Sequence, residues 1–311
     1  MAFSRFDLAA FENAKGSARL ARAAQLDAIC RETGFLVLEG HGVDHETIDA
    51  IWAACDAFFA LPAATKSALT PKPGDPYGYL GPKAEALAAS KGVETPPDLK
   101  ESFNGGPARV PDGLSDPDAL AFCFSKTPFP DLPGFQEAWT RFYATMEALA
   151  RRIMRAFAAA LGLEERYFDN TITEPISALR ALHYPPTGHD IEALQQRAGA
   201  HSDYGTLTIL LPQHGSSGLQ IFREGSWIDV PAPEGAFVIN IGDLMERWTA
   251  NRWVSTLHRV VAKPGQPARK SLAYFHQPNW FAEIAPLDGS DTFEPVLSGP
   301  YLMEKFRSTG V

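Results

Sequence analysis

The sequence predicts a mainly β protein with flanking helices, whose core is a sandwich or jelly roll of short strands. From residue 176 onward, short β-prone runs alternate with turn residues at near-regular spacing, which is typical of these folds. The first half instead carries segments whose apolar residues recur at helical spacing. With 311 residues, of which 45% are hydrophobic and 21% charged, the chain is long enough to bury a sizeable core.

Three segments show the periodicity of amphipathic helices. Residues 17–33 have apolar positions at helical spacing and are followed by Gly34, a residue that often ends helices. Residues 44–61 begin with Asp44, a favourable N-cap. The longest segment, residues 134–163, has a broad apolar stripe, which predicts a spine helix packed on a sheet.

The strand-like runs of the second half are short and are separated by turn residues. One pair should form a hairpin, because Glu224 and Gly225 lie between two of these runs. A polar segment, residues 244–253, interrupts the β pattern as a short helix or loop. The predicted strands lie within residues 176–186, 206–212, 218–222, 226–230, 236–242, 254–262 and 269–278.

Residues 70–118 are rich in proline and glycine, which predicts a long and largely irregular stretch. Long loops in compact domains are often lids, so we expect residues 1–120 to supply a lid packed on a core of residues 121–311, in one compact unit. Tyr77, Tyr79 and Phe103 in this stretch, together with Phe275, are candidates for the lining of a substrate pocket. Ordinary packing of the loop on the core is an equally good interpretation for each.

Composition and charge argue against several classes of protein. The net charge of −9 disfavours binding to phosphate backbones, so we expect no nucleic-acid partner. Cys30, Cys55 and Cys123 are far apart, which fits a reducing cytoplasm better than a disulfide framework. Asp7 and Glu12 stand where a signal peptide would be apolar, and no run is long enough to span a membrane. We therefore expect a cytoplasmic monomer or weak homo-oligomer.

The stretch HSDYGTLTIL, residues 201–210, contains two side chains of metal-binding type. His201 and Asp203 are two positions apart, so in an extended chain they point to the same face. A third ligand type, His258, lies in a later strand-like run. Taken singly, a buried histidine or a turn aspartate explains each residue. Two imidazoles and one carboxylate together match the facial ligand set of non-heme Fe(II) oxygenases.

A candidate anion site follows in the sequence. Arg269 and Ser271 alternate within a strand-like run, so both should face the same side. A guanidinium group beside a hydroxyl can bind a carboxylate, and Tyr184 offers a phenol to the same group. The alternative for Arg269 is an ordinary surface arginine at the end of a strand.

At these residues the chain resembles the 2-oxoglutarate/Fe(II)-dependent dioxygenase superfamily, and within it the isopenicillin N synthase-like branch. The series HxD…H…RxS carries the resemblance, with LHYPP before it and GLQIF, GSWIDV and AFVINIGD within it in the family's order. GFLVLEGHGV, residues 34–43, resembles the N-terminal segment of that branch, so the resemblance covers nearly the whole chain. Two departures distinguish the chain from many relatives, and the second places it away from the plant members, as a bacterial member. Leu182 replaces an asparagine that many relatives have, and residues 249–251 read Thr-Ala-Asn.

The resemblance implies a double-stranded β-helix (jelly-roll) core and two bound groups. It implies Fe(II) on His201, Asp203 and His258, and 2-oxoglutarate held by Arg269 and Ser271 with help from Tyr184. The implied activity is oxidation of a small molecule by O2, through hydroxylation, desaturation or ring closure, with release of succinate and CO2. Alternatives are an ethylene- and succinate-forming enzyme acting on 2-oxoglutarate, an Fe(II) oxidase that needs no keto acid, and a non-catalytic jelly-roll module that binds a ligand.

Overall fold

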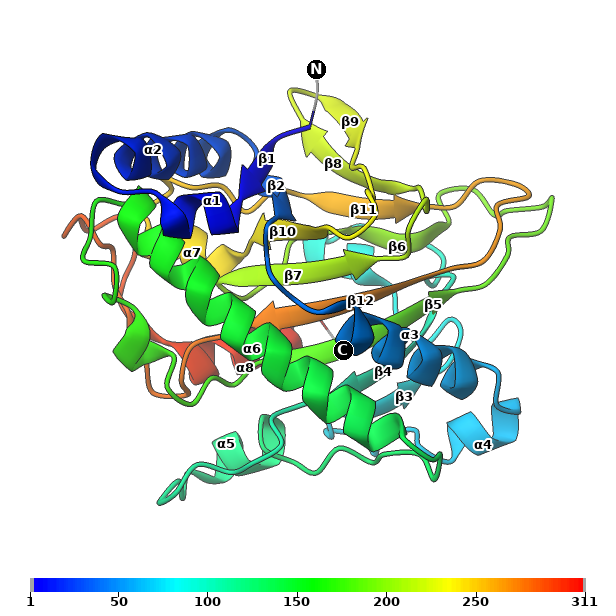
Figure 1. Ribbon diagram of the computed structural model, residues 1–311. Coiled ribbons are helices and arrows are strands. Elements are labelled where there is room, and N and C mark those ends of the chain that lie inside the picture. The colour runs from blue at the N-terminus through cyan, green and yellow to red at the C-terminus, as the bar shows by residue number, and fades with distance from the viewer. Residues whose placement is uncertain (1–2, 310–311) are drawn as a thin grey trace.

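In the computed structural model, which describes residues 3–309, two β-sheets face each other (Figure 1). Within these residues the larger sheet has eight strands, in the order β1 (Arg5–Asp7), β2 (Phe35–Glu39), β10 (Phe237–Ile241), β7 (Leu207–Pro212), β12 (Arg269–His276), β5 (Ala178–Tyr184), β4 (Glu101–Gly105) and β3 (Gly78–Leu80). The smaller sheet has the order β6 (Gln196–His201), β11 (His258–Val261), β8 (Leu219–Arg223) and β9 (Ser226–Asp229).

From β5 to β12 the chain passes repeatedly from one sheet to the other. Strands β5, β7, β10 and β12 lie in the larger sheet, whereas β6, β8, β9 and β11 form the smaller one. An apolar cluster that draws on both sheets fills the space between them, and it includes Leu182, Val238, Ala273, Ala198, Leu219 and Val260. This arrangement is the jelly roll that the sequence predicts.

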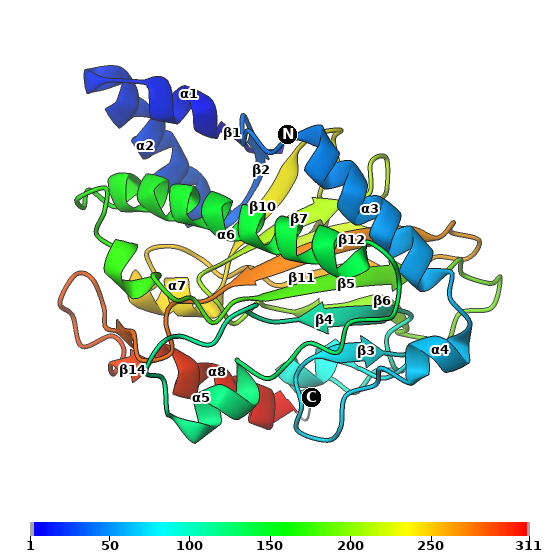
Figure 2. The ribbon, with the colours of Figure 1, turned by 60° about the horizontal axis from the view of Figure 1, so that its bottom comes forward.

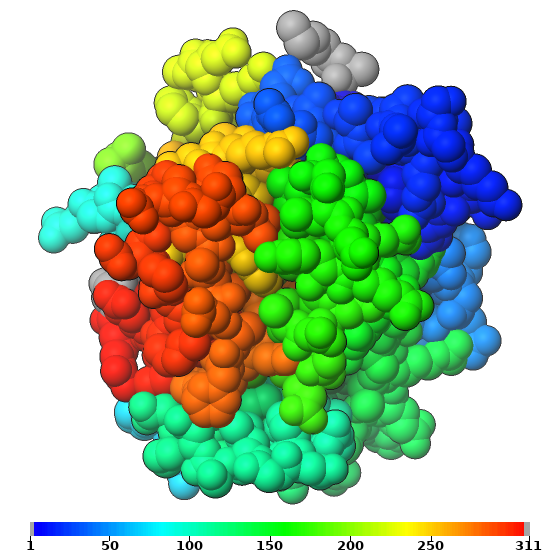
Figure 3. Space-filling view, turned by 90° about the vertical axis from the view of Figure 1, so that its left-hand side faces the viewer, coloured from blue at the N-terminus to red at the C-terminus, as the bar shows by residue number. Residues whose placement is uncertain are grey.

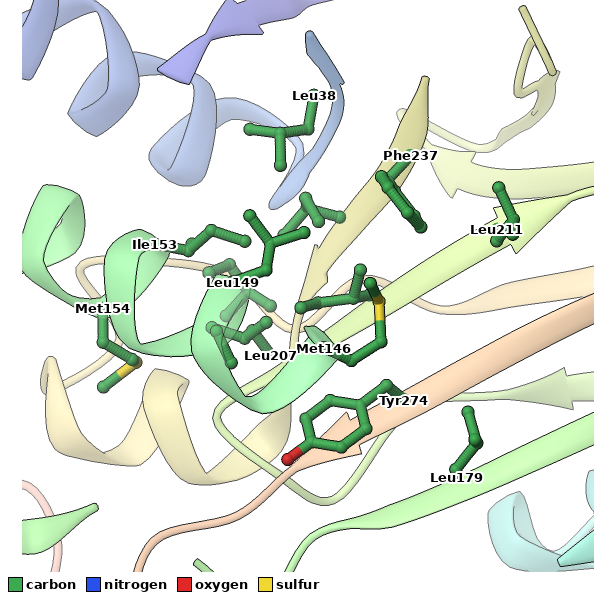
Figure 4. Close-up of a cluster of buried hydrophobic side chains, with 14 of the residues drawn as sticks. Leu38, Met146, Leu149, Ile153, Met154, Leu179, Leu207, Leu211, Phe237 and Tyr274 are labelled. Carbon is green, nitrogen blue, oxygen red and sulfur yellow. The ribbon is translucent and has the colours of Figure 1, made fainter. Parts of the chain in front are cut away.

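The long helix α6 (Phe135–Ala160) crosses the outer face of the larger sheet (Figure 1). Its Met146, Leu149 and Ile153 face Leu207 and Tyr274 of the sheet, all within the main core cluster (Figure 4). The predicted spine helix is therefore confirmed, and so are the two earlier helices, as α2 (Gly16–Glu32) and α3 (His45–Phe59). The remaining described helices are α1 (Leu8–Asn13), α4 (Ala63–Ser67), η1 (Leu87–Lys91), α5 (Pro117–Phe122), η2 (Asp169–Thr171), α7 (Asp243–Trp248) and α8 (Ser298–Thr309).

Local sequence signals explain several element boundaries. Asp44 caps α3, since its carboxylate accepts a hydrogen bond of 2.7 Å from the amide of Thr47. Glu224 and Gly225 both have positive φ, which places the predicted hairpin turn between β8 and β9. Two short strands, β13 (Glu283–Ile284) and β14 (Val296–Leu297), pair near the C-terminus.

Most of residues 70–118 is irregular, as predicted, but the stretch also contains short elements that the sequence does not predict. Strands β3 and β4 lie there, and β4 pairs with β5 in the larger sheet. The sequence of β4, ESFNG, has one large apolar residue, so its strand state comes from pairing with β5 rather than from its own propensity. The sequence also does not predict strand β6, QRAGAH, because this segment has little strand propensity of its own.

The N-terminal and C-terminal parts of the chain pack on the same core. Strands β1 and β2 extend the larger sheet beside β10, whereas β3 and β4 lie beside β5 at its other side (Figure 2). In the space-filling view, residues of the N-terminal part (blue) and of the C-terminal part (orange to red) form a continuous surface with the green residues between them (Figure 3). Among residues 3–309, no helix is long and apolar enough to cross a bilayer.

Candidate metal centre and anion site

The three predicted metal ligands converge at one end of the smaller sheet. His201 ends β6 and His258 begins β11, and the two residues are partners in the antiparallel register. Asp203 follows two residues after His201, and its Oδ1 lies 3.8 Å from Nε2 of His201 and 3.7 Å from Nε2 of His258. Two ligand atoms of a single ion, each at about 2.1 Å, can be at most about 4 Å apart. The cluster therefore fits one metal ion.

Backbone carbonyl groups set the orientation of both imidazole rings. Nδ1 of His201 lies 2.7 Å from the carbonyl oxygen of Gly199, and Nδ1 of His258 lies 3.0 Å from that of Thr256. A carbonyl oxygen can only accept, so each Nδ1 must carry the proton. Each Nε2 then directs a lone pair into the cluster, which is the form that binds a metal.

Asp203 is held by its other oxygen. Its Oδ2 accepts hydrogen bonds from Thr208 Oγ1 and from Asn240 Nδ2, at 2.5 and 2.7 Å. Both donors come from neighbouring strands, β7 and β10, and both are buried. These bonds leave Oδ1 turned toward the histidines, so the carboxylate has one oxygen free for a metal.

The charge states of these side chains also suit a cation. Burial and the nearby His258 lower the pKa of His201, which keeps this imidazole neutral near pH 7. Burial raises the pKa of Asp203, but the two histidines and the hydrogen bonds from Asn240 and Thr208 outweigh it, and the net shift is downward. Neutral imidazole and ionised carboxylate are the forms that coordinate metals.

The predicted anion site lies on the inner face of the larger sheet. Arg269 and Tyr184 are register partners on β12 and β5, and the guanidinium carbon lies 4.9 Å from the centre of the tyrosine ring. Ser271 is two residues further along β12 and is buried. Nη1 of Arg269 donates to the carbonyl of Ser217 at 3.1 Å, whereas its buried Nε has no partner. A buried guanidinium group in this state fits an anionic ligand.

Two of the candidate pocket residues, Tyr79 and Phe103, lie on the outer face of the larger sheet, which packs on the helices and not on the other sheet. Tyr79 donates a hydrogen bond to Glu101, and Phe103 packs against Phe135 and other aromatic rings of the helical layer. Both belong to the core cluster beneath α6, because their positions on β3 and β4 alternate to that side. Tyr77 is also buried and donates to the carbonyl of Cys123. Phe275, in contrast, packs on the apolar cluster between the two sheets.

Two other histidines, His183 and His41, lie outside the metal cluster. Nδ1 of His183 lies 2.7 Å from Glu101 Oε1, on the opposite face of β5 from Tyr184. His41 forms a hydrogen bond with the carbonyl of Gly235. Among the described residues, only His201, Asp203 and His258 form a cluster that could hold a metal.

A buried charged network near the metal cluster was not predicted from the sequence. Lys100 Nζ lies 2.9 Å from Asp98 and 3.2 Å from Glu85, and Glu85 also pairs with Arg180 at 3.2 Å. Arg180 donates to Asn104 Oδ1 at 2.7 Å, and it shares the inner face of β5 with the tyrosine of the anion site. Burial raises the pKa of Glu85, but the two cations lower it to about 2. The alternation of polar residues after position 97 is the sequence signal that could have revealed this network.

The proline- and glycine-rich stretch contacts the strand that carries His201. Helix η1 lies so close to β6 that a Cβ atom at Gly199 would be 2.7 Å from the amide nitrogen of Ala88. Lys91, at the end of η1, donates to Ser202 Oγ at 2.7 Å. Asp98 accepts hydrogen bonds from the amides of Leu87 and Gly199. This part of the stretch therefore lies beside the metal cluster.

Two family models match this chain, one in its C-terminal part and one in its N-terminal part. Residues 175–278 match the model of the 2OG-Fe(II) oxygenase superfamily. Residues 4–121 match the model of the non-haem dioxygenase in morphine synthesis N-terminal region. The first match contains the three candidate metal ligands and the candidate anion site.

Individual relatives cover most of the chain. Validamycin A dioxygenase from Streptomyces hygroscopicus subsp. limoneus is 33% identical over 289 residues, which cover 90% of this chain and 78% of the relative. The crystal structure of a full-length Neurospora crassa protein in complex with alpha-KG and thymine has a TM-score of 0.85 at 29% identity, and the match covers 99% of this chain and 96% of that one. The crystal structure of a putative 2OG-Fe(II) oxygenase family protein from Caulobacter crescentus has a TM-score of 0.82 at 30% identity, with 98% of both chains covered.

Proposed function

This chain belongs to the 2OG-Fe(II) oxygenase superfamily, and on that premise we propose that His201, Asp203 and His258 bind its iron. The protein is an Fe(II)- and 2-oxoglutarate-dependent oxygenase that acts on a small molecule. The convergence of two Nε2 atoms and one carboxylate oxygen, each oriented by a hydrogen bond on its far side, is the observation that carries the assignment of ligands.

An Fe(II) ion held by these three side chains would activate O2, which is the oxidant: one oxygen atom would enter succinate as 2-oxoglutarate loses CO2, and the other would oxidise the substrate, ending in the product or in water. We assign the distal carboxylate of 2-oxoglutarate to Arg269 and Ser271, assisted by Tyr184. The support is the buried guanidinium group of Arg269, whose Nε has no partner. These residues orient the co-substrate, and the buried walls of the barrel exclude water from the reacting groups.

We assign the cover of the site to the part of residues 70–118 that contains η1. Its contacts with Gly199 and Ser202, which flank His201, support this role. On the opposite wall, Phe275 and Arg180 are placed to meet the substrate, since both lie on the inner face of the larger sheet. The substrate is oxidised by hydroxylation, desaturation or ring closure.

Succinate release tests this function directly. Protein reconstituted with Fe(II) is supplied with O2, 2-oxoglutarate and a panel of amino acids, small hydroxy acids and aromatic metabolites. We expect one class of compound to raise succinate formation, with one oxidised product per succinate. Substrate oxidation that continues when 2-oxoglutarate is omitted would instead indicate an oxidase. Ethylene in the headspace without added substrate would indicate conversion of 2-oxoglutarate itself.

We further propose that the protein works in the cytoplasm as a monomer or weak homo-oligomer, without a nucleic-acid or membrane partner. The net charge of −9 supports the absence of nucleic-acid and membrane partners, since it repels phosphate-rich surfaces. Residues 1–120 and 121–311 act as one unit, because strands of both parts share the larger sheet. Light scattering across a range of protein concentrations should give the mass of one chain at the lowest concentration.

A further inference from the structure

A second buried arginine lies close to the proposed 2-oxoglutarate site. Arg197, on β6, is 2% exposed and is among the largest fully buried side chains. Its Nη2 donates to the carbonyl of Pro185 at 2.9 Å and to that of Pro267 at 2.6 Å. Pro185 directly follows Tyr184, and Pro267 stands two residues before Arg269. The side chain therefore joins the ends of the two strands that carry the proposed anion site.

The two arginines share this site without an acidic partner. Within residues 3–309, the hydrogen bonds of both guanidinium groups go to backbone carbonyls, and neither forms an ion pair. The Nε atoms of Arg197 and Arg269 are both buried and without a partner. Burial, and after it the charge of Arg269, lowers the pKa of Arg197. Two cations buried together without a counter-ion are costly, and an anion bound between them offsets that cost.

A purely structural role does not account for this arrangement. A neutral donor such as a glutamine amide could bind the carbonyls of Pro185 and Pro267 without bringing a charge into the interior. The positive charge at this position, aimed at no carboxylate of the protein, points to an anion supplied from outside.

We propose that Arg197 is a positioning residue of the co-substrate site, which orients Tyr184 and Arg269 and adds a second positive charge that attracts the distal carboxylate of 2-oxoglutarate. The proposal rests on the function proposed above. It predicts that the protein discriminates strongly between 2-oxo acids that end in a carboxylate and those that end in a methyl group. It also predicts that part of this discrimination comes from Arg197.

Calorimetric titration of the Mn(II)-loaded protein tests this without turnover. The probes are 2-oxoglutarate and 2-oxopentanoate, which share the 2-oxo acid end and differ only in the distal carboxylate. The ratio of their dissociation constants measures the preference for that carboxylate. In Arg197→Gln, which keeps donors but loses the charge, we expect this ratio to fall about tenfold, the size of one charge-assisted interaction. In Arg197→Lys we expect most of the ratio to remain.

A matched control is Arg151→Met, since Arg151 also donates to a backbone carbonyl, that of Ile172, but lies on α6 outside the barrel. This variant should keep the wild-type ratio. If Arg197→Gln weakens the binding of both probes equally, or of neither, then Arg197 has only a structural role and the proposal is wrong. If wild-type protein shows no preference for 2-oxoglutarate at all, the proposed co-substrate site fails as a whole. An effect of Arg269→Met without one of Arg197→Gln would overturn the further inference alone.

Discussion

The carboxylate of Asp203 illustrates how individual contacts prepare the metal cluster. One oxygen faces the two histidines, and the other is held by Thr208 and Asn240. Outer contacts of this kind commonly change metal affinity by about 10- to 100-fold when they are removed. The orientation of the ligand thus depends on strands β7 and β10 as much as on the motif itself.

This contact gives a first prediction. Thr208→Val removes a buried hydroxyl donor at nearly constant volume, and we expect Mn(II) affinity to fall about tenfold, because Asp203 gains freedom to rotate. Calorimetric titration with Mn(II) measures the change. Thr145→Val, on the exposed side of α6, is the control and should leave the affinity unchanged. An unaltered affinity in Thr208→Val would show that the carboxylate needs no help from this hydroxyl.

Arg269 gives a second prediction, for the co-substrate. We expect Arg269→Ala to weaken 2-oxoglutarate binding by roughly 10- to 100-fold, since a charge-assisted hydrogen bond contributes about 1.5–3 kcal/mol. Mn(II) affinity should stay near the wild-type value, because Arg269 touches none of the three metal ligands. Arg269→Lys should also bind less tightly, because it loses the planar fork. Equal 2-oxoglutarate affinity in wild type and Arg269→Ala would remove this residue from the site.

Among the elements, strands β3, β4 and β5 are joined to α4 by a buried ionic network. Glu101 lies at its centre, within 2.7 Å of both Lys66 Nζ and His183 Nδ1, and it accepts a hydrogen bond from Tyr79. Burial raises the pKa of Glu101, but its bonds to His183, Lys66 and Tyr79 outweigh burial and lower the pKa from 4.5 to about 2. The network therefore ties the N-terminal strands to the jelly roll.

The lowered pKa of Glu101 predicts a defined dependence of stability on pH. The free energy that it contributes is complete above about pH 4.5, where the unfolded carboxyl is ionised, and is lost as pH falls toward 2. Glu101→Gln should lower the free energy of unfolding at pH 7 and reduce its slope between pH 4.5 and 2. Urea unfolding at several pH values measures both. Glu137→Gln, an exposed substitution on α6, should change neither; an unchanged slope in Glu101→Gln would contradict the assignment.

Helix η1 packs closely on strand β6, and this contact depends on the absence of a side chain at Gly199. A Cβ atom there would lie 2.7 Å from the amide nitrogen of Ala88 and 3.0 Å from its Cβ, so the backbone of η1 must move. We expect Gly199→Ala to increase hydrogen exchange in residues 85–92 and to lower the yield of oxidised substrate per succinate. The cover would then fit less closely over the iron.

The control for this prediction is Gly188→Ala. The nearest atom to a Cβ at Gly188 is 4.0 Å away, so the substitution adds a side chain without a clash. Its hydrogen exchange in residues 85–92 should equal that of wild type. If Gly199→Ala keeps wild-type protection in these residues, η1 tolerates the added atom and does not depend on this close contact.

For the whole molecule, the larger sheet predicts that the N-terminal part and the core fold together. Strand β2 covers the edge of β10 and β4 covers the edge of β5, while α2 and α3 pack beside α6. A chain that begins at residue 121 would expose both sheet edges and part of the core, so we expect it to show no cooperative thermal transition. The full chain should melt sharply. A sharp transition in the shortened chain would establish residues 121–311 as an independent domain.

Much of this molecule follows from short stretches of its sequence. The stripe of residues 134–163 predicts α6, because the burial of one helical face imposes its own period. The series from His201 to Arg269 predicts the metal cluster and the buried arginine, because the ligand chemistry of iron and carboxylate restricts the residue types. Glu224 and Gly225 predict the hairpin turn, because few residues adopt positive φ readily.

Other features arise only when distant parts of the chain meet. Strand β4 has little strand propensity and exists because β5 pairs with it, and Tyr79 and Phe103 therefore face the helices instead of the barrel. The sequence around Arg197 does not reveal that this side chain is buried. Its burial results from the packing of β6 beside the ends of β5 and β12. Pairing and burial depend on contacts between residues far apart in the chain, and local sequence patterns do not predict such contacts.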